Sequence, residues 1–164
     1  MPMVRGLTPR PKYNRSLAGT PGPVAMSLAT QARQLGYHVT LAAPSADLVA
    51  IPDTDMLVDG FALGELTSTR RFIVVSTQGK GDEAALRAAA SIGAEYHAFV
   101  GSRRKMTVLR DKLCAAGVAR EALDKVKAPA GLDLGAITPE EIAMSILAEI
   151  TVERRRGQRA AVTD

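Results

Sequence analysis

The chain has 164 residues, 46% of them hydrophobic and 23% charged, which predicts one globular domain with short tails. No apolar run approaches the ~20 residues needed to cross a bilayer, and no charged-then-apolar leader opens the chain, so we expect neither a membrane span nor a secretory signal. The single cysteine, Cys114, can form neither an internal disulfide nor a cysteine-rich metal cage. This cysteine usage indicates the reducing cytoplasm.

The net charge of +4 is concentrated at the two ends of the chain. Residues 1–20 carry four basic residues and no acid, and residues 151–164 carry four arginines against two acids. The remaining body is slightly acidic and has no basic face interleaved with stacking aromatics, so we expect no nucleic-acid partner. The sequence predicts a flexible basic arm over residues 1–15 and a flexible tail over residues 156–164.

Between these ends, strand patterns alternate with helix patterns. The strongest strand pattern is the apolar run Phe72-Ile73-Val74-Val75, which is typical of a strand buried on both faces of a parallel sheet. A long helix begins after Thr138, which is expected to be its N-cap, with Glu141 closing a capping box. The other expected elements are, in chain order, a short candidate strand over 16–18, a helix over 24–35 ended by Gly36, strands over 38–42 and 56–58, a helix over 82–92, a strand over 96–100, a helix over 103–116 and a short strand over 125–127.

This alternation predicts an α/β fold over residues 16–155. Consecutive βαβ units imply a three-layer, Rossmann-like, doubly wound parallel sheet with helices on both faces. Open sheets of this kind bind ligands outside the carboxyl ends of their strands. Candidate site residues are therefore expected in the segments that follow strands.

The first such segment is residues 19–25, Gly-Thr-Pro-Gly-Pro-Val-Ala, which contains an altered dinucleotide fingerprint. In the G-x-G-x-x-G/A pattern, Thr20 occupies the first glycine position and two prolines remove amide donors. Residues 42–44, Ala-Ala-Pro, stand where an acidic residue that binds a ribose is expected. The segment is either a nucleotide-binding turn, with Gly19 and Gly22 close to a phosphate, or a plain tight turn.

The second segment, residues 76–83, follows the strongest strand. Gly79, Lys80 and Gly81 can bring backbone amides and one cation together on an anion, and Asp82 is expected to cap the following helix. The spacing is not that of a Walker loop. The alternative is a strand-to-helix turn with a surface lysine.

The third segment is residues 101–105, Gly-Ser-Arg-Arg-Lys. Ser102 is expected to cap a helix whose first turn contains Arg103 and Arg104. A helix N-terminus favours negative charge, so two arginines there indicate that they hold a phosphate or carboxylate. The alternative is a solvated basic turn.

The fourth segment, residues 129–136, precedes the last helix. Its glycines, Gly131 among them, suit a backbone that passes close to a ligand or to neighbouring loops. Asp133 is a candidate acceptor for a ligand hydroxyl or for an arginine of the third segment.

The remaining polar candidates have simpler explanations. His38 and His97 lie in strand patterns and are expected to be packed or edge residues, because a zinc site needs three or four protein ligands. Cys114 lies among apolar residues of a helix and is expected to be a small buried hydrophobe. Two histidines do not assemble a Ser-His-Asp or Cys-His arrangement, so we predict no metal site and no catalytic residues.

Three stretches resemble the C-terminal Rossmann domain of the XdhC/CoxI family: residues 78–83 (QGKGDE), 100–105 (VGSRRK) and 131–143 (GLDLGAITPEEIA). Members of this family are accessory proteins for the maturation of molybdenum hydroxylases such as xanthine dehydrogenase and carbon monoxide dehydrogenase. The resemblance is close over about residues 70–152 and weaker over 19–69. It implies binding of the molybdenum cofactor, as molybdopterin or its dinucleotide, and a molybdenum hydroxylase apo-enzyme as partner.

The resemblance also implies where such a cofactor lies. Gly79–Gly81 and Gly101–Arg104 are expected at its phosphate end, and Thr77, Gly131 and Asp133 near its ring or ribose. The chain lacks the separate N-terminal domain of longer members, so we expect a second chain that supplies it, or a homodimer. We expect a cofactor-binding accessory protein rather than an enzyme. Two alternatives stay open: an NAD(P)-binding oxidoreductase or dinucleotide sensor, and an interaction module whose loops are only turns.

Overall fold

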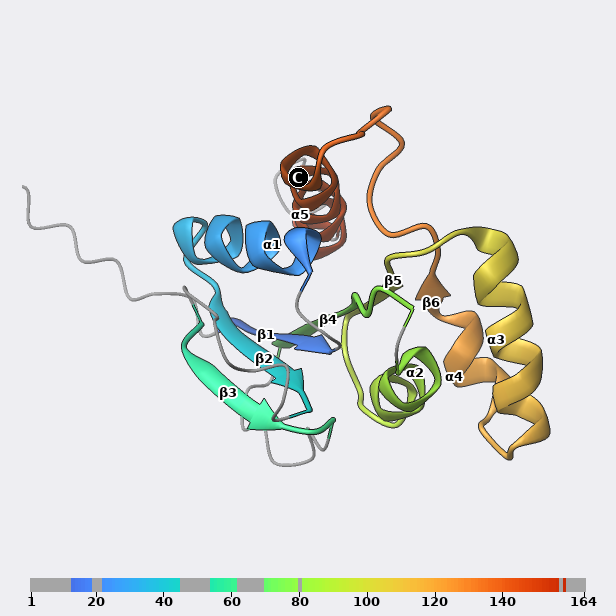
Figure 1. Ribbon diagram of the computed structural model, residues 1–164. Helices are drawn as coiled ribbons and strands as arrows, with labels where there is room; N and C mark the ends of the chain where they lie inside the picture. The colour runs from blue at the N-terminus through green and yellow to red at the C-terminus, as the bar shows by residue number, and fades with distance from the viewer. Residues whose placement is uncertain are drawn as a thin grey trace, which may run out of the picture.

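The computed structural model describes residues 13–18, 22–44, 54–61, 70–79, 81–156 and 158. Its strands form one parallel sheet with helices against both faces, which is the predicted three-layer, doubly wound α/β fold (Figure 1). The strands are β1 (Tyr13–Ala18), β2 (His38–Ala43), β3 (Met56–Asp59), β4 (Arg70–Val75), β5 (Tyr96–Phe99) and β6 (Val126–Lys127). The helices are α1 (Pro23–Gln34), α2 (Asp82–Ala90), α3 (Arg103–Ala115), α4 (Arg120–Asp124) and α5 (Pro139–Arg155).

The strand order is β3-β2-β1-β4-β5-β6. β1 lies in the centre of the sheet, β2 and β3 follow in order on one side of it, and β4 lies on its other side. At the carboxyl end of β1, Ala18 lies opposite Ala42 of β2 and Val75 of β4. The winding direction therefore reverses between β1 and β4, and the loops that follow these two strands emerge at the same edge.

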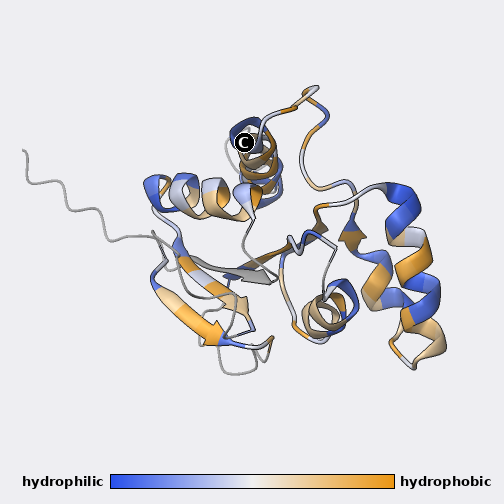
Figure 2. Cartoon of the chain, in the orientation of Figure 1, coloured by the Kyte–Doolittle hydropathy of each residue, from blue (hydrophilic) through white to orange (hydrophobic). Residues whose placement is uncertain are grey.

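The core consists of two apolar clusters separated by the sheet. Phe72 and Val74 of β4 pack with α1 and α5, whereas Ile73 and Val75 pack with α2, α3 and α4. None of these four side chains is more than 1% exposed. Successive residues of a strand point to opposite faces, so a strand covered by helices on both sides is apolar at every position. Figure 2 shows hydrophobic colour over most of β3 and part of β2, and mixed colour on the helices.

Two elements differ from the prediction. β1 begins at Tyr13, so residues 13–15, which we had assigned to the basic arm, belong to the sheet. The helix α4 was not predicted, because five residues are too few to show a helical hydrophobic period; its buried Leu123 anchors it to the core. All other observed ends lie within two residues of the predicted ones. No helix in the described ranges is long and apolar enough to cross a membrane.

The start of α5 is fixed by the predicted capping box. The Thr138 hydroxyl accepts a hydrogen bond from the Glu141 backbone N–H at 3.2 Å, and the Glu141 carboxylate accepts one from the Thr138 N–H at 3.0 Å. Pro139 occupies the first helical position, where its missing N–H has no helical acceptor. The helix then runs back across the sheet beside α1 (Figure 1).

Candidate functional site

The loops that follow β1 and β4 meet where the strand order reverses. Gly22 ends the first loop as the N-cap of α1, and a Cβ on Gly22 would lie 1.8 Å from Nε2 of Gln78 in the second loop. Gln78 has a φ of 50° and is, among the described residues, the one non-glycine with a positive φ. Because Gly22 has no side chain, the Gln78 side chain of the second loop can pack directly against it. Gly19, the other predicted residue of the first loop, lies outside the described residues.

The loop after β4 contains two glycines in the left-handed region, Gly79 (φ 91°) and Gly81 (φ 80°). Gly81 is the N-cap of α2, and no side chain caps this helix, so the prediction that Asp82 caps it is wrong. Asp82 is the first helical residue, and its buried carboxylate turns to Lys105, whose Nζ lies 2.7 Å from Oδ2. Lys80, which we predicted to hold an anion, lies outside the described residues.

Lys105 connects the second and third loops. It lies in the first turn of α3, and its Nζ is 3.8 Å from the position that a Cβ on Gly79 would take. The same ammonium lies 5.7 Å from the ring centroid of Phe99, at the end of β5. Thr77 is only 1% exposed, so it presents almost no surface to a ligand at this edge. Lys105 belongs to the motif of residues 101–105, but it is not one of the predicted site residues.

The third loop has the predicted helix start. The Ser102 hydroxyl accepts a hydrogen bond from the Lys105 backbone N–H at 3.1 Å, which confirms Ser102 as the N-cap of α3. The side chains of Arg103 and Arg104 are exposed, and no ion pair joins either guanidinium to another residue in the described part of the chain. Two unpaired cations thus stand at the end of a helix where positive charge is unfavourable.

The fourth loop is pressed against α5. Gly131 has a φ of 97°, and a Cβ there would lie 2.3 Å from the Ser145 hydroxyl oxygen and 3.0 Å from the Ile146 backbone nitrogen. Its N–H donates a hydrogen bond to Oε2 of Glu149 at 2.9 Å. Asp133 lies farther along the loop and is exposed. The close approach expected at Gly131 is therefore an approach to the last helix.

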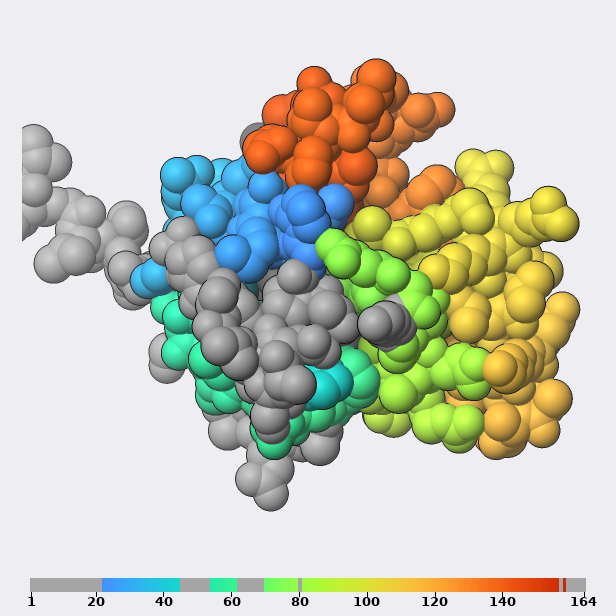
Figure 3. Space-filling view, in the orientation of Figure 1, coloured from blue at the N-terminus to red at the C-terminus, as the bar shows by residue number. Residues whose placement is uncertain are grey.

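The third and fourth loops border a cleft of about 1040 Å³. In Figure 3 the surface is indented between the yellow residues at the start of α3 and the orange residues that lead into α5. Of the predicted site residues, the cleft brings together Gly101, Ser102, Arg103, Gly131 and Asp133. Those that do not line it are Gly22, Thr77, Gly79, Gly81 and Arg104.

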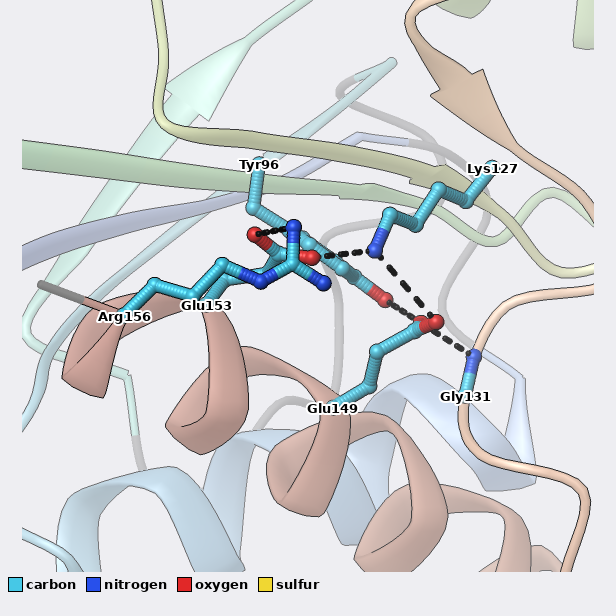
Figure 4. A network of polar contacts seen from close by, with 6 residues as sticks. All are labelled: Tyr96, Lys127, Gly131, Glu149, Glu153 and Arg156. Atoms are coloured by element: carbon cyan, nitrogen blue, oxygen red, sulfur yellow. Dashed lines mark hydrogen bonds and ion pairs between the residues drawn. The ribbon is translucent and has the colours of Figure 1, made fainter. Parts of the chain in front are cut away.

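A polar network at this cleft was not predicted (Figure 4). Oε2 of Glu149 accepts hydrogen bonds from the Tyr96 hydroxyl at 2.5 Å and from the Gly131 N–H. Lys127 donates to Oε1 of Glu153 at 2.5 Å and lies 3.6 Å from Oε1 of Glu149. Glu149 and Lys127 both line the cleft. The sequence does indicate Glu149: it follows Ile146 by three residues, so it places an acid on the apolar face of α5.

Both histidines lie in strands, as predicted, His97 in β5 and His38 in β2. His97 is 8% exposed, and its Nε2 lies 2.9 Å from the Ile92 carbonyl oxygen. Burial lowers the pKa of His97 below its ordinary value, with hydrogen bonds to backbone groups opposing part of the shift. His38 is exposed, and Cys114 is half-buried in α3. Across the described ranges, no three His, Cys, Asp or Glu side chains gather as metal ligands would.

Known proteins resemble this chain in sequence and in fold. The sequence model of the XdhC Rossmann domain matches residues 18–150. The uncharacterised protein YqeB of Escherichia coli K12 is 31% identical over an alignment 137 residues long that covers 79% of this chain and 25% of YqeB. A Bacillus halodurans crystal structure described as a xanthine dehydrogenase has a similar fold, with a TM-score of 0.72 at 24% identity over 93% of this chain and 46% of that one.

The chain thus spans about a quarter of YqeB and slightly less than half of the Bacillus protein. The match to the sequence model covers most of the chain, including β4, β5 and all four candidate loops. The chain belongs to the XdhC Rossmann-domain family.

Proposed function

We propose that this chain is an accessory protein in the maturation of a molybdenum hydroxylase, and that its cleft binds the phosphorylated pterin of the molybdenum cofactor. Two findings support an accessory role: membership of the XdhC Rossmann-domain family, and a fold shared with a protein described as a xanthine dehydrogenase. The observation that supports a ligand of this class is the cleft itself: Arg103 lines it with no ion pair to any described residue, and Gly101 and Gly131 line it without side chains.

The phosphate end of such a ligand fits the start of α3. Arg103 lines the cleft with no ion pair among the described residues, and it offers a planar fork of donors to a phosphate. The first amides of α3 add the positive end of a helix. Gly101 cannot obstruct this approach, and a Cβ there would lie 2.3 Å from a ring carbon of Phe99, so only glycine fits.

The opposite wall accommodates a flat ring. Gly131 presents backbone to the cleft, and Asp133 adds an exposed carboxylate there. A volume of about 1040 Å³ lies at the upper end of the range common for small-molecule sites, about 300–1,000 Å³. The bound cofactor supplies the molybdenum-carrying group that the hydroxylase uses. The residues of this chain hold and orient it, and we assign none of them a catalytic step.

Dinucleotide binding is the second candidate, because the strand order is that of dinucleotide-binding sheets. Its site would be the reversal point between β1 and β4, beside Gly22. Two features weigh against it there: the Gln78 side chain fills the space at Gly22, and residues 42–44 hold no acid for a ribose. NAD and NADP, titrated separately, test this candidate, and saturable micromolar binding would favour it over the pterin.

Adjacent arginines provide the test of the cleft. We would titrate the full chain with 6-hydroxymethylpterin pyrophosphate and follow the pterin fluorescence. Arg103→Ala removes a cleft-lining guanidinium and is expected to weaken binding at least about tenfold. Arg104→Ala makes the same change one residue farther on, outside the cleft, and is expected to change affinity less than about threefold. Equal losses in both variants, or no binding to the parent chain, would contradict the assignment.

The partner is tested by capture from the native host. The tagged full chain is expected to retain a molybdenum hydroxylase apo-enzyme, together with material that shows pterin fluorescence after release. Capture of a hydroxylase by the parent chain and also by Arg103→Ala would support the accessory role but would show that Arg103 in the cleft is not needed to bind the hydroxylase.

A further inference from the structure

We propose that Oε1 of Glu149 recognises the ring of the ligand, and that it selects a 2-amino-4-oxopyrimidine ring such as that of a pterin or a guanine. This inference rests on the proposed function, since it assumes that a phosphate at Arg103 places a ring in the same cleft. In the part of the chain that the structure describes, no aromatic side chain lines this cleft to select a ring by stacking, so we expect hydrogen bonding to provide the selectivity.

Glu149 has acceptor capacity that the protein does not fill. An ionised carboxylate offers about four lone-pair positions. Oε2 receives two donors, the Tyr96 hydroxyl and the Gly131 N–H. Among the described residues, no hydrogen bond to Oε1 is formed; the Lys127 ammonium lies 3.6 Å from it, an ion-pair distance that is longer than a hydrogen bond. That ammonium instead bonds Glu153 at 2.5 Å.

Glu149 lies where a ligand in the cleft can reach it. Its side chain is 14% exposed, and it is one of the residues that line the cleft. Tyr96 and Gly131 hold the carboxylate from β5 and from the fourth loop, so it is oriented before a ligand arrives (Figure 4). A fixed and largely dehydrated acceptor discriminates between ligands more strongly than one in water, because a missing donor is not replaced by solvent.

The other acids of the cleft do not have this combination. Asp133 is exposed, so water competes for its oxygens. Asp124 is 54% exposed, against 14% for Glu149, so water also competes for its oxygens. Glu149 is therefore the acid whose pairing with a ligand changes affinity most.

The chemistry of the acceptor specifies the ring. Oε1 can accept a hydrogen bond from the amino group of a 2-amino-4-oxopyrimidine, and the adjacent ring N–H of that ring points toward the same carboxylate, where it adds attraction rather than repulsion. A hypoxanthine ring lacks the amino group, and an adenine ring places a lone pair beside its own amino group, where it faces the carboxylate. The cleft thus combines a cation for a phosphate with an acceptor for a donor-rich ring.

The test compares guanosine 5′-monophosphate with inosine 5′-monophosphate, which differ by the amino group alone. The parent chain is expected to bind the guanine nucleotide at least about tenfold more tightly, and Glu149→Gln to lose this preference while inosine monophosphate binds as before. Glu149→Gln retains an oxygen for the Gly131 N–H, and circular dichroism of the variant checks that it folds. Asp124→Asn is the matched control, since it removes another carboxylate that lines the cleft, one that pairs with Arg110 rather than with Lys127, and it is expected to keep the preference.

6-Hydroxymethylpterin pyrophosphate distinguishes the two sources of this ring. Tighter binding of the pterin than of the guanine nucleotide identifies a pterin ligand, and the reverse order identifies a nucleotide; both support recognition by Glu149. Equal affinity for the guanine and hypoxanthine nucleotides, or a preference that survives Glu149→Gln, overturns the inference and leaves the proposed cleft intact. Failure of all three ligands to bind overturns both.

Discussion

Lys105 in the first turn of α3 lies 2.7 Å from the carboxylate of Asp82 in the first turn of α2. The pair joins the loops that follow β4 and β5. The Asp82 side chain is 7% exposed and the Lys105 side chain 44%, so the pair has a buried acid and a partly solvated base. The other carboxylate oxygen of Asp82 is buried and has no hydrogen-bond partner within the described residues. Lys105 is therefore the principal compensation for this buried charge.

We predict that Lys105→Met destabilises the fold by about 1–3 kcal/mol, because it leaves a buried carboxylate without its cation. The measurement is urea unfolding near neutral pH. Lys112→Met is the matched control: Lys112 pairs with Glu83 between the same two helices, but both side chains are largely exposed. Its expected loss is about 0–1 kcal/mol. Equal losses in the two variants would show that the burial of Asp82 does not matter.

A second prediction concerns the contact between the fourth loop and α5. Gly131 and Gly117 have similar backbone angles, with φ of 97° and 91°. A Cβ on Gly117 would meet nothing within 4 Å, whereas one on Gly131 would collide with the Ser145 hydroxyl and approach the Ile146 backbone. We expect Gly117→Ala to cost about 1–2 kcal/mol of unfolding free energy, from backbone strain alone.

Gly131→Ala is expected to cost at least about 1 kcal/mol more than Gly117→Ala, since the loop has to move away from α5. Urea unfolding of both variants gives the comparison. The movement would also disturb the hydrogen bond from Gly131 to Glu149 and so widen the cleft. If the two alanine variants are equally stable, the close packing at Gly131 is not a constraint.

The third prediction concerns acid sensitivity. Burial lowers the pKa of His97 from its ordinary value of 6.5, so the unfolded chain binds a proton there more readily than the folded chain does. This contribution to stability is complete above about pH 6.5 and is lost as pH falls through the lower pKa of the folded state. We expect the urea midpoint of the parent chain to fall between pH 7.5 and 5.5.

His97→Asn is expected to show a smaller fall over the same interval, because it removes the buried imidazole. His38→Asn removes an exposed imidazole of β2 and serves as the control; its midpoint is expected to fall as that of the parent chain does. A parent-like fall in His97→Asn would assign the acid sensitivity to other groups. The comparison is made within each variant across pH, so a general loss of stability in His97→Asn does not affect it.

The sheet was predictable because its strongest strands carry their own signal. The run in β4 is apolar at every position, which requires cover on both faces, and the glycines and caps mark most helix ends. α4 carried no such signal, since a helix of five residues has one buried anchor and no period. The start of β1 was missed because polar residues at 13–15 resemble the basic arm that precedes them.

The site was only partly predictable. Rules for strand ends and helix starts located Ser102, Arg103 and Gly131, because each depends on neighbours in the sequence. The partners of Asp82 and Glu149 depend on residues of other elements, 23 and 18 positions away in the nearest cases, and no local rule supplies them. Asp82 has the spacing of a helix cap, but the cation across the loop attracts its carboxylate more strongly than backbone amides do.

The helix α5 contributes to both the core and the cleft through residues of the same few turns. Its apolar side, with Ala143, Ile146 and Ile150, fills the core against the sheet, while Ser145 and Glu149 form one wall of the cleft. A shift of this helix that relaxes the core changes the width of the cleft by a comparable amount. Repacking of the core therefore changes the fit of a ligand in the cleft. Substitutions on the inner face of α5 have to preserve both the core packing and the width of the cleft.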